Sequence, residues 1–182
     1  MTPFAARRSC LAALCIGLAL LGAASQAAAH PHVFVEVAPS FIMAKGRIVG
    51  MQVEWVFAAI FSSAIIRDFD TNRDRQFSSG ETEKLKAGAF DNLKAYGYFT
   101  HFRFNEKMDV STEIQDFSAA VSPNGNLVYT FIVRPPRHVD PKQVSFDVML
   151  FDETYYVDLR LMPGKPITFT GSEGCSGDVD RN

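Results

Sequence analysis

The sequence predicts an α+β fold in which a helix pair is inserted into a largely antiparallel sheet. Apolar and polar residues alternate near the start, apolar spacing changes to three and four residues over 57–69, and strand-like segments fill the second half. The 182 residues are 47% hydrophobic and 21% charged, which is the composition of a chain that folds. We therefore expect one domain.

The first 29 residues have the pattern of a cleaved secretory signal. Two arginines precede an apolar run over 11–24, and the small residues Ala27 and Ala29 follow it. This run is shorter than the roughly 20 apolar residues that a membrane helix needs. We expect cleavage after Ala29 to release residues 30–182 into the periplasm, with no membrane-spanning segment left.

Loss of the signal changes the charge and the cysteine content. Basic residues fall from 18 to 16 while acidic residues stay at 20, so the mature chain is acidic. This balance excludes the basic surface of a nucleic-acid-binding domain. Cys175 is then the single remaining thiol, which excludes an intramolecular disulfide.

Periodicity and turn residues divide the mature chain into elements. Residues 32–37 alternate as in a half-buried strand, with three valines on one face. Helical spacing predicts a mostly apolar, well buried helix over 57–69 and a second helix over 81–96, on either side of a polar interval. The other predicted strands are 41–43, 48–56, 98–104, 111–121, 127–133, 144–151 and 155–161, with a turn over 44–47 between the first two. The glycine-rich tail after about 163 is expected to be loose.

The polar interval between the helices carries a calcium-loop pattern. Positions 1, 3, 5, 7 and 12 of this loop at 70–81 are Asp70, Asn72, Asp74, Gln76 and Glu81. Calcium takes six to eight oxygen ligands, which alternate side chains of a tight loop supply while the last carboxylate closes the far side. The match at Asp70, Asn72, Asp74 and Glu81 alone would arise by chance in roughly 0.4% of chains of this length.

Two arginines depart from the calcium-loop pattern. Position 6, where the sharp turn favours glycine, is Arg75, and a left-handed conformation there costs about 1 to 2 kcal/mol. Arg73 and Arg75 also offset two of the three carboxylate charges. The alternative is a solvated turn of mixed charge that keeps the helix-loop-helix shape without metal. If calcium binds, we expect it to join the two helices.

Histidines at the start of the mature chain form a second candidate site. Cleavage after Ala29 gives His30 a free amine beside its imidazole, and such nitrogens suit zinc, copper, nickel or cobalt. Pro31 has no amide proton, which excludes the planar four-nitrogen chelate. The alternative is a set of exposed polar residues at a chain terminus. The candidates to complete a site around His30 are His32, Glu36, His101 and His138.

Nothing in the sequence points to an enzyme. It has no serine elbow, phosphate loop or dinucleotide fingerprint. Asp152, Glu153 and Asp158 are interpreted as turn and solvent-face charges, and Cys175 has no recognisable base beside it. The enzyme alternative, a copper oxidase with an N-terminal histidine clamp, would require a second imidazole opposite His30. Because the sequence carries none of the catalytic motifs named above, we expect a non-enzymatic protein.

Several segments together carry a family resemblance. They are HPHVF at 30–34, VEW at 53–55, the loop at 70–81, YFT at 98–100 and FDETYY at 151–156. In this order they resemble the bacterial family DUF1007, which is often described as a periplasmic component of an uncharacterised ABC-type transport system. The resemblance implies a secreted protein associated with zinc, nickel or cobalt transport.

By position, the resemblance makes His30 and His32 the natural transition-metal candidates. The residues at 70–81 match an acidic loop that is common in this family. Two departures stand out: many relatives look acidic where this chain has Ala58-Ala59, and Arg75 replaces the expected loop glycine.

We therefore expect a periplasmic accessory protein that binds zinc, nickel or cobalt for a membrane metal transporter, either an ABC-type system or a nickel/cobalt permease. The mature chain is small for the two lobes of a dedicated substrate-binding protein. The alternative is a structural calcium-binding domain with an EF-hand-like loop and no transition-metal role.

Overall fold

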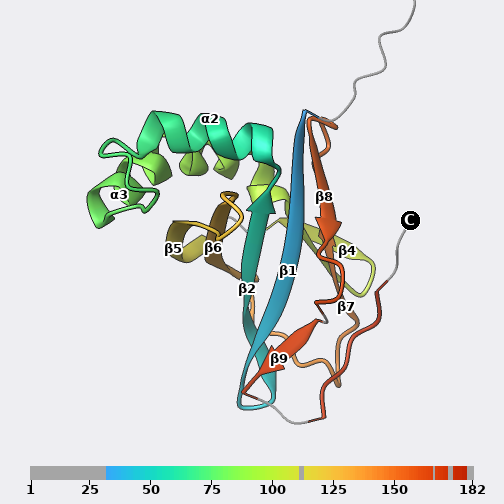
Figure 1. Cartoon of the computed structure of the whole chain (residues 1–182). Helices are drawn as coiled ribbons and strands as arrows, with labels where there is room; N and C mark the ends of the chain where they lie inside the picture. The colour runs from blue at the N-terminus through green and yellow to red at the C-terminus, as the bar shows by residue number, and fades with distance from the viewer. Residues whose placement is uncertain (1–31, 111–112, 166, 172–173, 180–182) are drawn as a thin grey trace, which may run out of the picture.

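A computed structural model describes residues 32–110, 113–165, 167–171 and 174–179, which form a mixed α/β fold with mostly antiparallel sheets, as predicted (Figure 1). In chain order the elements are β1 (Val33–Ala44), β2 (Arg47–Phe57), α2 (Ala59–Phe69), α3 (Ser79–Gly88), the 3₁₀ segment η1 (Phe90–Phe99), β3 (Thr100–Phe104), β4 (Lys107–Val110), β5 (Glu113–Val121), β6 (Leu127–Arg134), β7 (Phe146–Leu150), β8 (Val157–Leu161) and β9 (Thr168–Thr170). No helix in these ranges has the length and apolar content needed to cross a membrane.

The larger sheet has the strand order β5-β6-β2-β1-β8, and β9 also pairs with β1. Neighbouring strands are antiparallel except that β8 and β9 run parallel to β1. β8 pairs with the first half of β1 and β9 with Ser40 to Ile42, so the two strands share one edge. Pro39 lies between these two paired segments, at a position where its missing N–H breaks neither pairing.

The alternation predicted at the start of β1 is confirmed. Val33, Val35 and Val37 are buried, whereas the side chains between them are exposed. The two strands predicted on either side of 38–40 are one continuous strand. Lys45 and Gly46 have φ of 49° and 73° and make the predicted turn into β2, since two left-handed residues match the twist of a hairpin.

The core lies between the inner face of the large sheet, η1 and a smaller sheet of order β4-β3-β7. Trp55 of β2 packs edge-on against Phe131 at 4.9 Å between ring centroids and stacks on Phe99 at 5.9 Å. Phe90, the first residue of η1, packs against Phe117 at 4.2 Å. The aromatic residues that periodicity assigned to separate elements therefore form one core.

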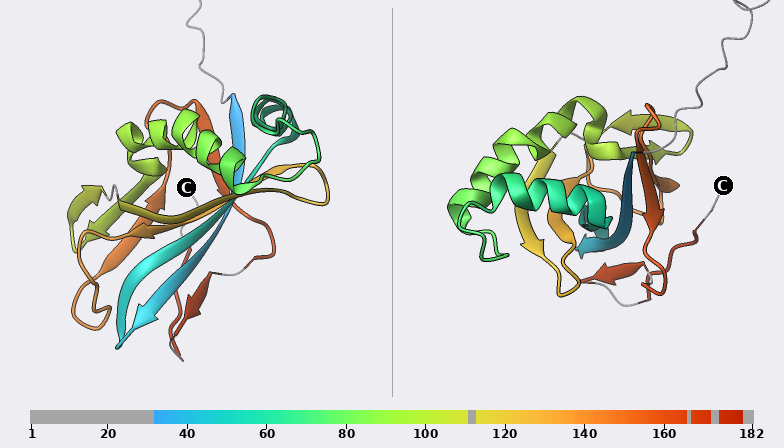
Figure 2. Two further views of the ribbon diagram at one scale, coloured as in Figure 1. Left: turned by 90° about the vertical axis from the view of Figure 1, so that its left-hand side faces the viewer. Right: turned by 45° about the horizontal axis from the view of Figure 1, so that its top comes forward.

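Helices α2 and α3 lie together beside the ends of β5 and β6 (Figure 2). Ser62 fixes α2 to the sheet, because its buried hydroxyl donates to Phe57 O at 3.0 Å and accepts from Leu127 N–H at 2.9 Å. The helix is less buried than predicted: only the face of Phe61, Ile65 and Phe69 packs on the core, and Ile60 is 89% exposed.

The second helix and the C-terminal tail differ most from the sequence prediction. The second helix begins at Ser79 and ends at Gly88, where Ala89 leaves helical geometry and the chain continues as η1. The tail predicted to be loose contains β9, whose Phe169 stacks on Phe41 at 5.3 Å. Three residues are too few to show a period, so the packing of one aromatic ring decides this strand.

Candidate metal-binding loop and histidines

Helix-end signals fix both ends of the loop between α2 and α3. Asp70 is the residue at which α2 ends, and its N–H donates to Ile66 O at 2.9 Å. Ser78 caps α3: its hydroxyl accepts from Glu81 N–H at 3.4 Å, while the Glu81 carboxylate accepts from Ser78 N–H at 3.1 Å. The end of α2 at Asp70 and the reciprocal capping box at Glu81 place the first and last predicted ligands at the two helix ends.

Asp70 is the most unusual side chain of the loop. It is only 4% exposed, and its Oδ2 accepts a hydrogen bond from Arg75 N–H at 3.0 Å. Its Oδ1 is buried and has no hydrogen-bond partner in the part of the chain that the structure describes. Since the Oδ2 bond turns the carboxylate toward the loop backbone, Oδ1 is an unused buried acceptor beside the loop. Such acceptors are rare because they lose their hydration without replacement.

The middle of the loop turns its side-chain oxygens toward its own backbone. Asn72 Oδ1 accepts from Asp74 N–H at 3.1 Å, and Asp74 Oδ1 accepts from Gln76 N–H at 2.8 Å. Arg73 and Arg75 both have φ of 61°, so the left-handed strain expected at Arg75 is present and is repeated at Arg73. The side chains of residues 72–76 are exposed, whereas Phe77 packs against the core.

Glu81, at the last position of the loop, is held by hydrogen bonds from both loop ends. Its Oε1 accepts from Thr71 Oγ1 at 2.6 Å and Thr71 N–H at 2.7 Å, and its Oε2 accepts from Ser78 Oγ at 2.8 Å and from the Ser78 N–H. The hydroxyl of Thr71 first, then the donors of Ser78 and the Thr71 amide, lower the pKa of Glu81 from 4.5 to about 2. The carboxylate is therefore ionised at neutral pH.

The loop brings the five calcium-type residues predicted from the sequence into one turn, but it does not gather their carboxylates. Within residues 32–110, 113–165, 167–171 and 174–179, no three His, Cys, Asp or Glu side chains converge as a ready-made metal cluster. The reason at this loop is that Glu81 faces Thr71 and Ser78.

The candidate histidine site begins outside the described residues, because His30 precedes them. His32 is exposed at the entry to β1, with its ring 5.0 Å from the ring of Tyr156 and its N–H donating to Tyr156 O. Glu36 shares the exposed face, as predicted. Four residues of strand separate Glu36 from His32 by about 13 Å.

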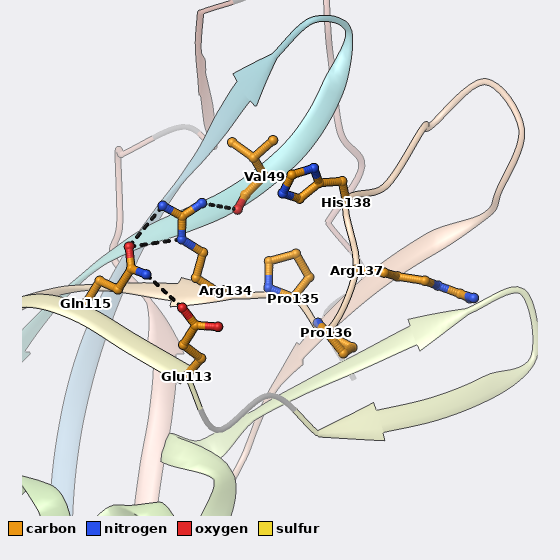
Figure 3. A pocket seen from close by; sticks show the side chains of 8 residues that line it. All are labelled: Val49, Glu113, Gln115, Arg134, Pro135, Pro136, Arg137 and His138. Atoms are coloured by element: carbon orange, nitrogen blue, oxygen red, sulfur yellow. Dashed lines mark hydrogen bonds between the residues drawn. The ribbon is translucent and has the colours of Figure 1, made fainter.

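The other two histidines, His101 and His138, stand on other segments of the chain than His32. His101 is buried in β3, where its ring stacks on Phe151 at 4.1 Å. His138 is exposed beside a depression of about 430 Å³, in which its ring points toward Val49 (Figure 3). Arg137, next to it, lies over the ring of Phe104 at 4.4 Å. In the described part of the chain, neither histidine joins His32 in a group of three or more His, Cys, Asp or Glu side chains that could hold a metal ion.

Asp152 is a buried carboxylate that the sequence interpretation placed on the surface. It is 6% exposed and accepts from Thr154 N–H at 2.9 Å, Thr154 Oγ1, Tyr156 N–H at 3.1 Å and Val157 N–H at 2.9 Å. Burial raises its pKa, but these hydrogen bonds outweigh burial and leave the pKa below 3.8. The aspartate followed two residues later by threonine is a turn pattern that signals this role.

The loop and the start of β1 are at opposite ends of α2. Ala58 N–H donates to Phe34 O at 3.0 Å, so α2 begins beside β1. The 11 residues of α2 then carry the chain about 16 Å before the loop starts. The calcium-type residues and His32 therefore form two separate candidate sites.

Comparison with known proteins gives relatives without a described activity. A family model described as a protein of unknown function (DUF1007) matches residues 15–181. An uncharacterized 15.5 kDa protein in the trpE 3′ region of Spirochaeta aurantia is 31% identical over 116 residues, which cover 63% of this chain and 81% of that protein. An uncharacterized protein of Haemophilus influenzae is 25% identical over 154 residues, covering 83% and 72%. No solved structure matches.

Proposed function

The chain belongs to the DUF1007 family, and from the geometry of its loop we propose that it is a non-enzymatic divalent-cation-binding protein of the periplasm, an accessory to a membrane metal transporter. The observation that supports cation binding is the buried, unpartnered Oδ1 of Asp70. A cation beside this oxygen would replace the hydration that burial removes. The export signal predicted from the sequence supports the periplasmic compartment, and the family resemblance supports the association with a transporter.

Calcium is the cation that suits the loop best. All five predicted ligands offer oxygen: carboxylates at Asp70, Asp74 and Glu81 and side-chain amides at positions 3 and 7. Oxygen-only sites favour calcium or magnesium, whereas zinc, nickel and cobalt favour nitrogen and sulfur. Arg73 and Arg75 lower the net negative charge of the loop, so we propose a weak site in the range of about 10⁻⁴ to 10⁻³ M.

The proposed role of the ion is structural. Asp70 ends α2 and Glu81 stands in the first turn of α3, so an ion bound to both carboxylates would join the helices as an EF-hand-like pair. Both helices also pack on the core, through Phe69 of α2 and Leu85 of α3. Calcium would therefore stabilise the whole domain.

Thermal unfolding of residues 30–182 with and without calcium tests this role. At ten times its dissociation constant, calcium should add about 1.4 kcal/mol, which corresponds to a rise of about 3 to 6 °C. Asp70→Asn should abolish the rise, whereas Asp109→Asn, at an exposed carboxylate of β4, should retain it. A wild-type melting temperature that does not change on addition of calcium would contradict the proposal.

A second candidate role, transition-metal binding, is favoured by the exposure of His32 at the entry to β1. We propose that zinc, nickel or cobalt binds there through His32 together with the imidazole and free amine of His30. Mature protein with an authentic His30 terminus would be titrated with each metal. His32→Ala should weaken binding, and His138→Ala, at another exposed histidine, should not. Equal affinity in the two variants would exclude this site.

A further inference from the structure

Glu81 has no free acceptor position for a cation in the state that the structure shows. We propose that Thr71 is a latch that competes with the cation for the Glu81 carboxylate and so sets the affinity of the loop. This inference rests on the calcium site proposed above. It assigns to Thr71, at a loop position that supplies no ligand, control over how tightly the ion is held.

The count of hydrogen bonds on Glu81 supports the latch. An ionised carboxylate has about four lone-pair positions, two on each oxygen. Thr71 fills both positions on Oε1 through its hydroxyl at 2.6 Å and its amide at 2.7 Å. Ser78 fills those on Oε2 through its hydroxyl at 2.8 Å and its amide at 3.1 Å. A bidentate contact with calcium therefore requires Glu81 to give up hydrogen bonds that it already has.

Thr71 is the donor that can be exchanged with the least disturbance. The Ser78 bonds join residues three apart and belong to the capping box that starts α3. The Thr71 bonds reach across the loop to a residue ten positions later, so their loss leaves the helix start intact. The bonds from Thr71 are charge-assisted and short, which makes them effective competitors of a weakly bound ion.

Asp70 and Glu81 then have different parts in binding. Asp70 Oδ1 is free of hydrogen bonds from the described residues, so it can bind an ion without giving up a hydrogen bond. Glu81 contacts the ion only after Thr71 releases it. Because the pKa of Glu81 is about 2, the carboxylate is already ionised at neutral pH and no proton has to leave. The competition is between the cation and the Thr71 donors.

Calcium titration of four proteins tests the latch: wild type, Thr71→Val, Thr71→Ser and Thr82→Val. Valine removes the hydroxyl and keeps the shape, so calcium should bind about three- to ten-fold more tightly, the fold-change of one lost competing hydrogen bond. Serine keeps the hydroxyl and should restore the wild-type affinity. Thr82→Val makes the same change on α3, beyond the loop, and should leave the affinity unchanged.

The outcomes separate the latch from the calcium site itself. Equal or weaker calcium binding by Thr71→Val than by wild type would overturn the latch and leave the site in place. Calcium binding by the valine variant alone would support the latch. No binding by either protein at about 20 mM calcium, well above the range of weak sites, would overturn both.

A measurement on the wild-type protein covers the case in which Thr71→Val does not fold. The Thr71 amide donates to Glu81 Oε1, so opening of the latch should move its NMR resonance upfield as calcium is added. The amide of Gln76, which donates to Asp74, reports whether the loop has bound the ion at all. A response of the Gln76 amide without one at Thr71 would overturn the latch.

Discussion

Asp70 and Asp152 are both buried aspartates that follow a phenylalanine and begin a turn, yet their carboxylates are used differently. Asp152 accepts hydrogen bonds from four donors, the Thr154 hydroxyl and the amides of Thr154, Tyr156 and Val157, spread over its two oxygens. Asp70 accepts one, from Arg75 N–H to Oδ2, and its Oδ1 has no partner in the described chain. Burial of a carboxylate therefore does not by itself indicate a ligand site; unused acceptor capacity does.

The difference comes from how each turn continues. After Asp152 the chain returns at once to start β8, so the amides of Thr154, Tyr156 and Val157 converge on one carboxylate. After Asp70 the loop is longer, and its amides are shared among Asp70, Asn72 and Asp74. In the first turn, the backbone and side-chain donors satisfy both oxygens of Asp152 without an ion. In the second, Oδ1 of Asp70 receives no hydrogen bond from the described residues.

The largest expected effect is the loss of the Asp152 carboxylate. Asp152→Ala should destabilise the domain by about 3 kcal/mol, because several donors of the turn lose a charged acceptor at once. Urea denaturation at neutral pH measures this loss. Glu153→Ala, at the exposed neighbouring residue, should change stability by less than about 0.5 kcal/mol. Equal effects of the two substitutions would show that the Asp152 turn does not stabilise the fold.

The same denaturation applied to Asp70 sharpens the comparison. In the presence of a chelator, Asp70→Asn should leave stability unchanged or raise it by up to about 1 kcal/mol, since an amide oxygen still accepts from Arg75 N–H and a buried charge is removed. Asp152→Asn should be destabilising under the same conditions. A loss of stability on Asp70→Asn as large as that on Asp152→Asn would mean that the Asp70 carboxylate is as fully hydrogen-bonded as that of Asp152.

Acid unfolding tests the carboxylate of Glu81, at the far end of the loop from Asp70. The pKa of Glu81 falls from 4.5 to about 2 on folding, so its stabilising contribution is complete above pH 4.5 and is lost as the pH falls toward 2. Glu81→Gln should therefore reduce the fall of the melting temperature as the pH decreases from 4.5 to about 2. Glu83→Gln, at an exposed glutamate of α3, should keep the wild-type acid slope. An unchanged slope in Glu81→Gln would contradict the hydrogen bonding of this carboxylate.

Local patterns predicted those parts of the fold that depend on neighbours in sequence. The alternation of Val33, Val35 and Val37, the turn at Lys45-Gly46 and the helix-loop-helix order around 70–78 are confirmed. Each follows from a period or a turn residue. Patterns did not predict the break of the second helix at Ala89 or the strand at Thr168–Thr170. Both depend on packing between segments far apart in the chain.

For the candidate sites, the sequence identified residue types and spacing but not which acceptors are free. It predicted that Asp70 and Glu81 stand at the ends of one loop, and they do. It gave no sign that Thr71 donates hydrogen bonds to the Glu81 carboxylate or that Asp152 is buried. Those facts depend on hydrogen bonds whose directions only the folded backbone sets.

The sequence alone was enough to predict the mixed architecture, the family and the oxygen-rich loop between two helices. Periodicity, turn residues and ligand spacing are local properties that can be read without the fold. The tertiary structure decided that His32, His101 and His138 stand on different segments and form no group of three metal-ligand side chains within the described residues. It also decided that one loop carboxylate has an unused oxygen while another is fully bonded. How many hydrogen bonds a carboxylate receives depends on where the folded chain places each donor, and the spacing of residues along the sequence does not predict it.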